Sequence, residues 1–225
     1  MGEPSSPRGD TRESTYTDIG AIPGEALRIS RESRMLARKV IGDRSDEDRV
    51  RQRCAIAVGD MEMAGLLRFM HDPVRAGLEA LARRALIVTD IRMVMVGIQK
   101  KGHGSRITCA LDHAERAEAE GITRARAGIL ALRGELQGAI VVIGNAPSAL
   151  LSLCDLVEEG IAPALVIGTP VGFVNAAESK ERLRSLPVPS ISNVGTRGGT
   201  PVAVAAMNEI ITIFAERRVE RGDGG

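Results

Sequence analysis

The sequence lacks the features that mark membrane, secreted and nucleic-acid-binding proteins. No apolar run approaches the ~20 residues that span a bilayer, and the polar N-terminus contains no apolar signal-peptide segment. The 30 Lys and Arg residues are balanced by 29 Asp and Glu residues, so the net charge of +1 creates no field that would attract nucleic acid or an anionic membrane. We therefore expect a cytoplasmic protein without a nucleic-acid or membrane partner.

Cysteine is scarce, and the phosphate-binding motifs are absent. Cys54, Cys109 and Cys154 are odd in number, widely spaced and mostly placed in apolar runs, which suits reduced buried thiols better than disulfides or a metal site. The segment 195–200 lacks the lysine and the spacing of a P-loop, and no Gly-x-Gly-x-x-Gly opens a strand-helix unit near the start. The sequence thus disfavours nucleotide binding and predicts no metal.

Strand-length apolar runs alternate with segments of helical period, as in βα units. This pattern predicts a single-domain, three-layer α/β/α fold with a mainly parallel central sheet, over 21–217, between a flexible N-terminal arm (1–20) and a flexible tail (218–225). The expected strands are 85–89, 93–97, 106–111, 139–143, 164–168 and 188–193. The expected helices are 25–41, 46–69, 73–83, 112–134, 146–159, 176–185 and 200–217.

Three Gly- and Pro-rich corners join predicted strands to predicted helices, at 144–147, 168–173 and 195–201. Ligands of open parallel sheets bind beyond the carboxyl ends of the strands. Backbone N–H groups at a helix N-terminus suit carboxylates or phosphates. An ordinary turn is the alternative interpretation of each corner taken alone, but three in one chain favour an anion-binding pocket.

Three long strings carry a family resemblance: GAIVVIGNAPSAL (138–150), PALVIGTPVGFVNAAESKERL (163–183) and GTRGGTPVAVAAMN (195–208). The sequence resembles the precorrin-8X methylmutase (precorrin isomerase) family of corrin-ring biosynthesis over about 17–213. The resemblance implies an isomerase that moves a methyl group from C-11 to C-12 of precorrin-8X, or of its cobalt form, to give hydrogenobyrinate or cobyrinate. It also implies that no cofactor is needed and that a homodimer shares its site between subunits.

The resemblance further implies which residues bind the polycarboxylate macrocycle. Ser33 matches a substrate-contacting serine, and Arg124 matches an arginine placed to pair with a carboxylate, which a guanidinium grips with two parallel hydrogen bonds. The substrate-binding residues expected from the corners are Gly144, Asn145, Pro170, Gly172, Arg197, Gly198 and Gly199.

One position departs from the family pattern. The family carries a catalytic histidine in a segment like Arg-Val-Ile-His-Thr-Thr-Gly-Asp, whereas residues 53–60 read RCAIAVGD, which places Ile56 at the histidine position. Isoleucine has no donor and no titratable proton, and losing a general acid typically costs about 10² to 10⁴ in rate. The catalytic residue is therefore unassigned, with His103 and Asp60 as candidates.

Three functional hypotheses follow from this departure. The first is an active isomerase, with the acid supplied elsewhere or with proton donation less important. The second is a non-catalytic corrinoid-binding relative that acts as a carrier or scaffold. The third keeps the fold but takes another tetrapyrrole as substrate. The breadth of the matched pocket strings favours the active isomerase.

Overall fold

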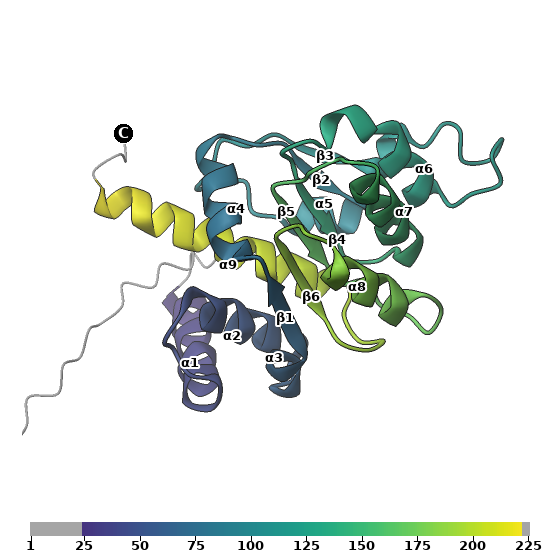
Figure 1. The fold of residues 1–225 in the computed structure, drawn as a ribbon. Coiled ribbons are helices and arrows are strands. Elements are labelled where there is room, and N and C mark those ends of the chain that lie inside the picture. The colour runs from purple at the N-terminus through teal and green to yellow at the C-terminus, as the bar shows by residue number, and fades with distance from the viewer. Residues whose placement is uncertain (1–23, 222–225) are drawn as a thin grey trace, which may run out of the picture.

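The structure, a computed structural model, describes residues 24–221. Its centre is a six-stranded sheet of order β1-β6-β5-β4-β2-β3 (Figure 1). The strands are β1 (Leu67–Met70), β2 (Ile87–Thr89), β3 (Ile107–Cys109), β4 (Ile140–Ile143), β5 (Leu165–Gly168) and β6 (Ser190–Asn193). Neighbouring strands pair in parallel except β1, which runs antiparallel to β6 at one edge. The mainly parallel sheet and the single α/β domain are confirmed.

Helices cover both faces of the sheet. They are α1 (Gly24–Ile41), α2 (Asp46–Val58), α3 (Glu62–Leu66), α4 (Pro73–Ala82), α5 (Arg92–Gly97), α6 (Arg124–Ala131), α7 (Pro147–Glu158), α8 (Ala176–Ser185) and α9 (Thr200–Glu220), with short 3-10 turns η1 (Ala110–His113) and η2 (Arg133–Glu135). Helices α2, α4, α5 and α9 pack on one face, and α6, α7 and α8 pack on the other.

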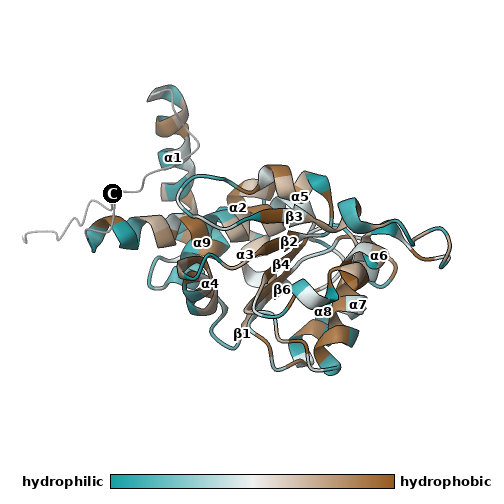
Figure 2. Ribbon diagram, turned by 90° about the horizontal axis from the view of Figure 1, so that it is seen from above, coloured by the Kyte–Doolittle hydropathy of each residue, from teal (hydrophilic) through white to brown (hydrophobic). Residues whose placement is uncertain are grey.

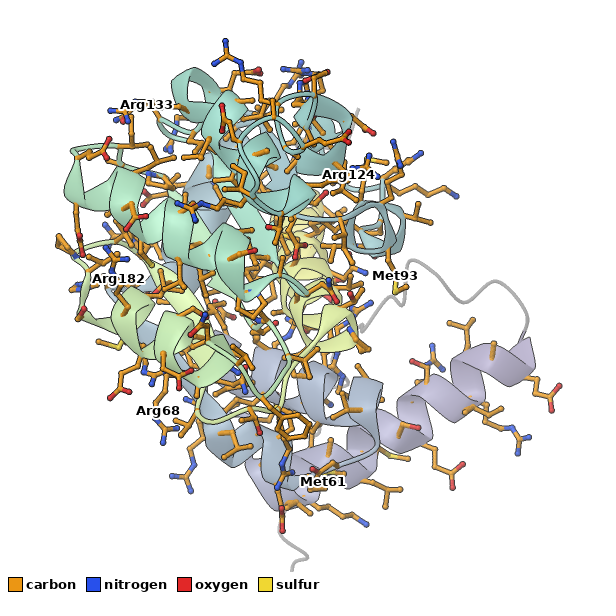
Figure 3. The ribbon with its side chains drawn as sticks, turned by 90° about the vertical axis from the view of Figure 1, so that its right-hand side faces the viewer. Met61, Arg68, Met93, Arg124, Arg133 and Arg182 are labelled. Atoms are coloured by element: carbon orange, nitrogen blue, oxygen red, sulfur yellow. The ribbon has the colours of Figure 1, made fainter. Side chains whose placement is uncertain are left out.

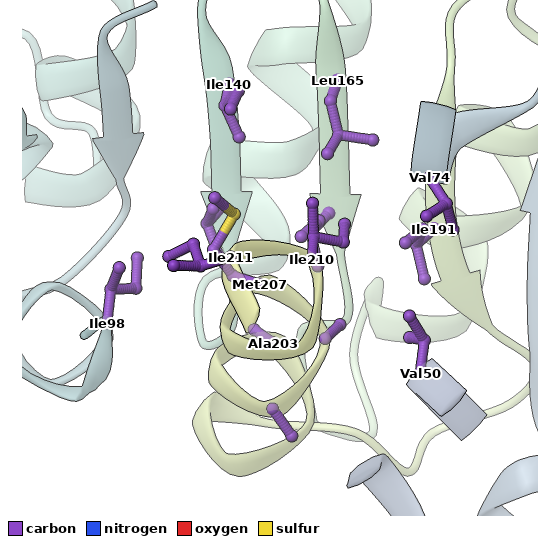
Figure 4. Packing of buried hydrophobic residues seen from close by; sticks show 14 of the residues in the cluster. Val50, Val74, Ile98, Ile140, Leu165, Ile191, Ala203, Met207, Ile210 and Ile211 are labelled. Atoms are coloured by element: carbon purple, nitrogen blue, oxygen red, sulfur yellow. The ribbon is translucent and has the colours of Figure 1, made fainter. Parts of the chain in front are cut away.

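The core lies in two layers because strand residues alternate between the faces of the sheet. Ile140 and Val142 of β4 point into the cluster that contains α9 (Figure 4), and Val141 and Ile143 point into the cluster that contains α7. The central strands are buried on both sides, which is why they read as continuous apolar runs. Figure 2 shows this apolar centre between more polar outer helices.

Helix α9 is the main support of its layer. Its residues from Val202 to Ile213 are buried, apart from a half-buried Val204, because it packs against β4 and β5 on one side and α2 on the other. Helix α1 rests on α2 and projects away from the body of the molecule (Figures 2 and 3). Helices α1 and α9 thus both pack against the same helix, α2.

The predicted strand 93–97 is wrong, because these residues form helix α5. Alternating Met and Val residues fit a strand and a short half-buried helix equally well, so periodicity alone does not decide. Packing against α9 decides: a Cβ on Gly97 would lie 2.8 Å from the Val204 side chain. In addition, Asn208 Nδ2 donates to the Gly97 carbonyl. A glycine at this position permits the close helix contact.

Two long predicted helices are interrupted. The helix predicted over 46–69 ends at Val58, where Gly59 takes the left-handed conformation (φ 65°), and the segment then forms α3 and strand β1. The helix predicted over 112–134 forms only from Arg124, because Thr123 caps α6 by accepting from the Arg126 N–H. Glycine and local capping, rather than helix propensity, set these boundaries.

The remaining boundaries agree more closely with the expectation. Helix α9 continues to Glu220, past the predicted start of the tail at 218, while the arm 1–20 and the residues after 221 lie outside the described residues. The three cysteines are buried and free, as predicted. Within residues 24–221 no helix has both the length and the apolar character needed to cross a bilayer.

Candidate functional site

A cavity of about 320 Å³ lies between α1, α2 and the first turns of α9. The lining of the cavity combines apolar side chains with two arginines. Its lining residues are Ser30, Arg34, Arg53, Ile56, Ala57, Pro201, Val204, Ala205 and Asn208. Ile56, the residue that the resemblance matches to the family histidine, is among these lining residues.

Three arginines converge on one buried carboxylate beside this cavity. Glu209 of α9 is fully buried and binds Arg34 at 2.6 Å, Arg49 at 2.9 Å and Arg53 at 3.2 Å. Burial alone would raise the pKa of Glu209, but the three guanidinium charges outweigh burial and lower it. Glu216 pairs with Arg49 in turn. Two of the arginines, Arg34 and Arg53, also line the cavity, so its polar wall is positively charged.

The two candidates for a substitute acid are already engaged. His103 has both ring nitrogens occupied: Nδ1 accepts from the Ser105 N–H at 3.1 Å, which leaves Nε2 to donate to the Gln99 carbonyl at 2.9 Å. Asp60 lies just beyond α2, pairs with Arg197 at 2.5 Å and accepts from the Glu62 N–H. His103 lines a separate cavity, and neither residue lines the one beside Ile56.

The 144–147 corner is closed by a residue that the sequence analysis missed. Asp90, just after β2, is buried and accepts from the N–H groups of Gly144, Asn145 and Ala146 at 3.2, 2.8 and 2.8 Å. The expectation of bare N–H groups here is therefore wrong, because an internal carboxylate occupies this helix N-terminus. Burial raises the pKa of Asp90, and these N–H donors oppose the rise.

The other two corners bind each other. They follow the neighbouring strands β5 and β6, and Gly199 N–H donates to the Thr169 carbonyl at 2.7 Å while Gly172 N–H donates to the Thr196 carbonyl at 3.1 Å. Gly198 has φ 143°, and a Cβ there would lie 2.4 Å from the Thr169 oxygen. Pro170 is buried beneath this contact. The predicted residues at these corners form one continuous loop pair at the carboxyl edge of the sheet.

Ser33 and Arg124 lie outside the cavity. Ser33 is on α1, one turn from the cavity residue Ser30. Arg124 is the exposed first residue of α6, and within residues 24–221 no hydrogen bond or ion pair occupies its guanidinium. Figure 3 shows Arg124 and Met93 on the side of the molecule toward which α1 projects. The sequence-predicted residues are therefore not gathered in one pocket.

The residues that sequence reasoning missed share a recognisable signal. Glu209 is the only acid within the buried part of α9, from Val202 to Ile213, and Asp90 directly follows a strand at the carboxyl edge. A lone acid in a buried apolar segment requires a partner. The arginine-rich segments around Arg34 and Arg53 could have supplied one. Only the fold shows which arginine meets which acid.

Comparisons with known proteins agree with this architecture. A model of the family described as CbiC, precorrin-8X methylmutase, matches residues 28–213. The chain is 42% identical over 206 residues to cobalt-precorrin-8 methylmutase of Methanocaldococcus jannaschii, covering 86% of this chain and 96% of that protein. It is 39% identical over 176 residues to precorrin-8X methylmutase of Pseudomonas aeruginosa, covering 75% of this chain and 85% of that protein.

Solved structures lead to the same family. The crystal structure of precorrin-8X methyl mutase from Thermus thermophilus matches with a TM-score of 0.78 and 37% identity, covering 85% of this chain and 97% of that one. A precorrin-8X methylmutase related protein matches with a TM-score of 0.73 and 32% identity, covering 80% of this chain and 99% of that one. Sequence, fold and comparisons converge, and the chain belongs to the precorrin-8X methylmutase family of isomerases.

Proposed function

We propose that this chain moves a methyl group between the neighbouring ring carbons C-11 and C-12 of precorrin-8X or of its cobalt form. The observation that carries the proposal is the cavity at Ile56, whose lining combines apolar side chains of α2 and α9 with the arginines Arg34 and Arg53. A flat apolar macrocycle fringed with carboxylates requires both kinds of surface. The reaction rearranges one molecule, so no co-substrate has to bind.

In this proposal the protein contributes positioning and charge. The three guanidinium groups outnumber the two carboxylates of the cluster, Glu209 and Glu216, and this excess attracts substrate carboxylates. Val204 and Pro201 hold an apolar part of the ring. A ring fixed in one orientation brings the migrating methyl close to its acceptor carbon, which lowers the entropic part of the barrier. Guanidinium N–H groups supply the hydrogen bonds that Ile56 does not.

We further propose that two copies assemble with a shared site. The cavity lies at the low end of the ~300–1,000 Å³ range of ligand pockets, and it therefore holds only part of a corrin. Ile29, Leu36 and Val40 lie on one face of α1 with Ser33 between them, and the three apolar side chains are 54%, 54% and 68% exposed. An apolar stripe of this kind beside an incomplete cavity suits a second copy.

Replacing Leu36 with glutamate is expected to weaken this dimer. A carboxylate in the middle of an apolar interface is desolvated without a partner, so the dimer dissociation constant should rise by about 100-fold, or ~2.7 kcal/mol. Light scattering during gel filtration over a concentration series measures the constant. Val219→Glu, at an exposed position near the end of α9, is the matched control. A wild-type chain that stays monomeric throughout would contradict the proposal.

Arg124 lies outside the cavity of its own subunit, and we propose that it reaches the macrocycle in the shared site of the dimer. Replacing it with alanine is expected to weaken substrate binding by about 2 kcal/mol, roughly 30-fold, because one charge-assisted hydrogen-bonded pair is lost. The exposed guanidinium makes no internal contact in the described chain, so the free energy of unfolding should stay unchanged. Titration of the substrate's visible spectrum gives the dissociation constant. Arg126→Ala, on the same helix, is the control, and equal affinities in the two variants would assign Arg124 to the surface.

Turnover tests the proposed reaction directly. Purified protein incubated with precorrin-8X should develop the visible spectrum of the red-orange product. Ala57→Trp, which fills the cavity from an exposed position on α2, should abolish that change. Tight binding of the macrocycle without turnover would reject the isomerase in favour of a carrier. A cytoplasmic, reducing environment suits the three buried thiols, and we propose that the reaction occurs there.

A further inference from the structure

Lys180 of α8 is a fully buried lysine whose ammonium group faces a loop instead of a carboxylate. Its Nζ donates to the Arg197 carbonyl at 2.6 Å and to Asn193 Oδ1 at 3.3 Å, and no ion pair to it occurs among residues 24–221. Burial, followed by the positive charge of Arg184, lowers the pKa of Lys180 to about 8. The group is thus mostly charged at neutral pH, which strengthens both hydrogen bonds.

Burying an ammonium group without a carboxylate partner is costly. The benefit that offsets this cost is the fixed position of the Arg197 carbonyl. The Arg197 carbonyl also accepts from Asn193 Nδ2 at 2.6 Å, and two donors therefore fix one carbonyl in the middle of the 195–199 loop. The residue that follows, Gly198, has a positive φ that side chains avoid. Lys180 and Asn193 together keep the loop in this strained course.

The loop joins two walls of the cavity. The Arg197 guanidinium binds Asp60 at 2.5 Å and Glu62 at 2.9 Å, just beyond the end of α2, which carries Ile56. On its other side the loop leads through Gly199 into α9, whose second residue, Pro201, lines the cavity. A shift of the Arg197 backbone would therefore move the first turn of α9, and with it Pro201, relative to α2 where the substrate is proposed to bind.

We propose that Lys180 is a positioning residue for the methyl migration, which sets the distance between the α2 and α9 walls of the cavity by fixing the Arg197 carbonyl. The role rests on the proposed function, because only that function assigns the substrate to this cavity. Lys180 touches no substrate, and it acts through the 195–199 loop and the Arg197 contacts to Asp60 and Glu62.

Amide hydrogen exchange of the free protein tests the mechanical part without substrate. In Lys180→Met the 195–199 loop, the 59–62 segment and the first turn of α9 should exchange roughly ten-fold faster or more, the effect of losing a charged hydrogen-bond donor. Arg182→Met is the matched control, because Arg182 lies on the same helix but pairs with Asp155 and Glu158 of α7. Faster exchange limited to α8 and β6 would overturn the proposal.

Kinetics test the functional part. In Lys180→Met, KM for precorrin-8X should rise roughly ten-fold and kcat should fall by a smaller factor. The reason is that a displaced cavity wall weakens substrate binding more than it slows the chemical step. Arg182→Met should stay close to wild type. If Lys180→Met does not fold, Lys180→Gln, which keeps a neutral donor, is measured in the same way. If the loop exchanges at the same rate in the variant and in wild type, the positioning role is refuted. If the loop exchange changes in the variant but the wild-type protein does not turn over precorrin-8X, only the proposed reaction is refuted.

Discussion

Replacing Glu209 with alanine should lower the free energy of unfolding by about 3–5 kcal/mol, because it leaves buried guanidinium groups without their counter-charge. Arg34 is almost fully buried, and its other partners include the Arg49 carbonyl and Gln52, while Arg49 and Arg53 would repel it. Since Arg34 links α1 to α9, helix α1 should detach first. Urea unfolding followed by circular dichroism measures the loss.

Glu216→Gln is the matched control for this change. Glu216 lies two turns later on α9 and pairs with Arg49, but it is partly exposed, so the loss should stay near 1 kcal/mol or less. A loss for Glu209→Ala no larger than that of the control would show that the three arginines are solvated without the acid, and that the cluster does not hold α1.

The pH dependence of stability provides a second measurement on Glu209. Its pKa in the folded state is lowered by the three arginines, so its contribution is present above the unfolded value of 4.5 and is lost as pH falls through the folded pKa. The stability difference between wild type and Glu209→Gln should therefore be largest above pH 5 and shrink in acid. A constant difference down to pH 3 would contradict the ionised state of Glu209.

The centre of the sheet could be predicted from the sequence because its strands have a simple apolar pattern. Strands β4 and β5 are buried on both faces and bounded by Gly and Pro residues, so they appear as short continuous apolar runs. Strand β1 was missed because it lies at an edge of the sheet, carries Arg68 and follows α3 without a break. The segment 93–97 was mistaken for a strand because its contact with α9 is not encoded within the segment itself.

The candidate site was less predictable, for an electrostatic reason. Glycine corners that look open to an anion in the sequence can be filled by the protein's own carboxylate, as Asp90 fills the 144–147 corner. The partners of Arg34 and Arg53 lie more than 150 positions away, on α9. No local pattern reports such pairs.

Replacing Ile56 with histidine should raise kcat for the methyl migration by about 10²-fold or more, the usual contribution of a general acid. Ile56 lines the cavity one helical turn from Arg53, so an imidazole there would project toward the bound ring. Among the residues that line this cavity, those with polar side chains are Ser30, Arg34, Arg53 and Asn208, and none of these releases a proton near neutral pH. Stopped-flow spectroscopy of the product gives the rate.

The proton can be separated from the hydrogen bond by two further variants. Ile56→Asn supplies a donor that does not titrate, and Ala57→His places an imidazole one position further along α2. If proton donation limits the reaction, only Ile56→His should gain rate, and the gain should fade as pH rises through an imidazole pKa of about 6.5. An equal gain from Ile56→Asn would show that a hydrogen bond suffices. Unchanged kcat in all three variants would mean that orientation by the arginine wall, and not acid catalysis, sets the rate in this chain.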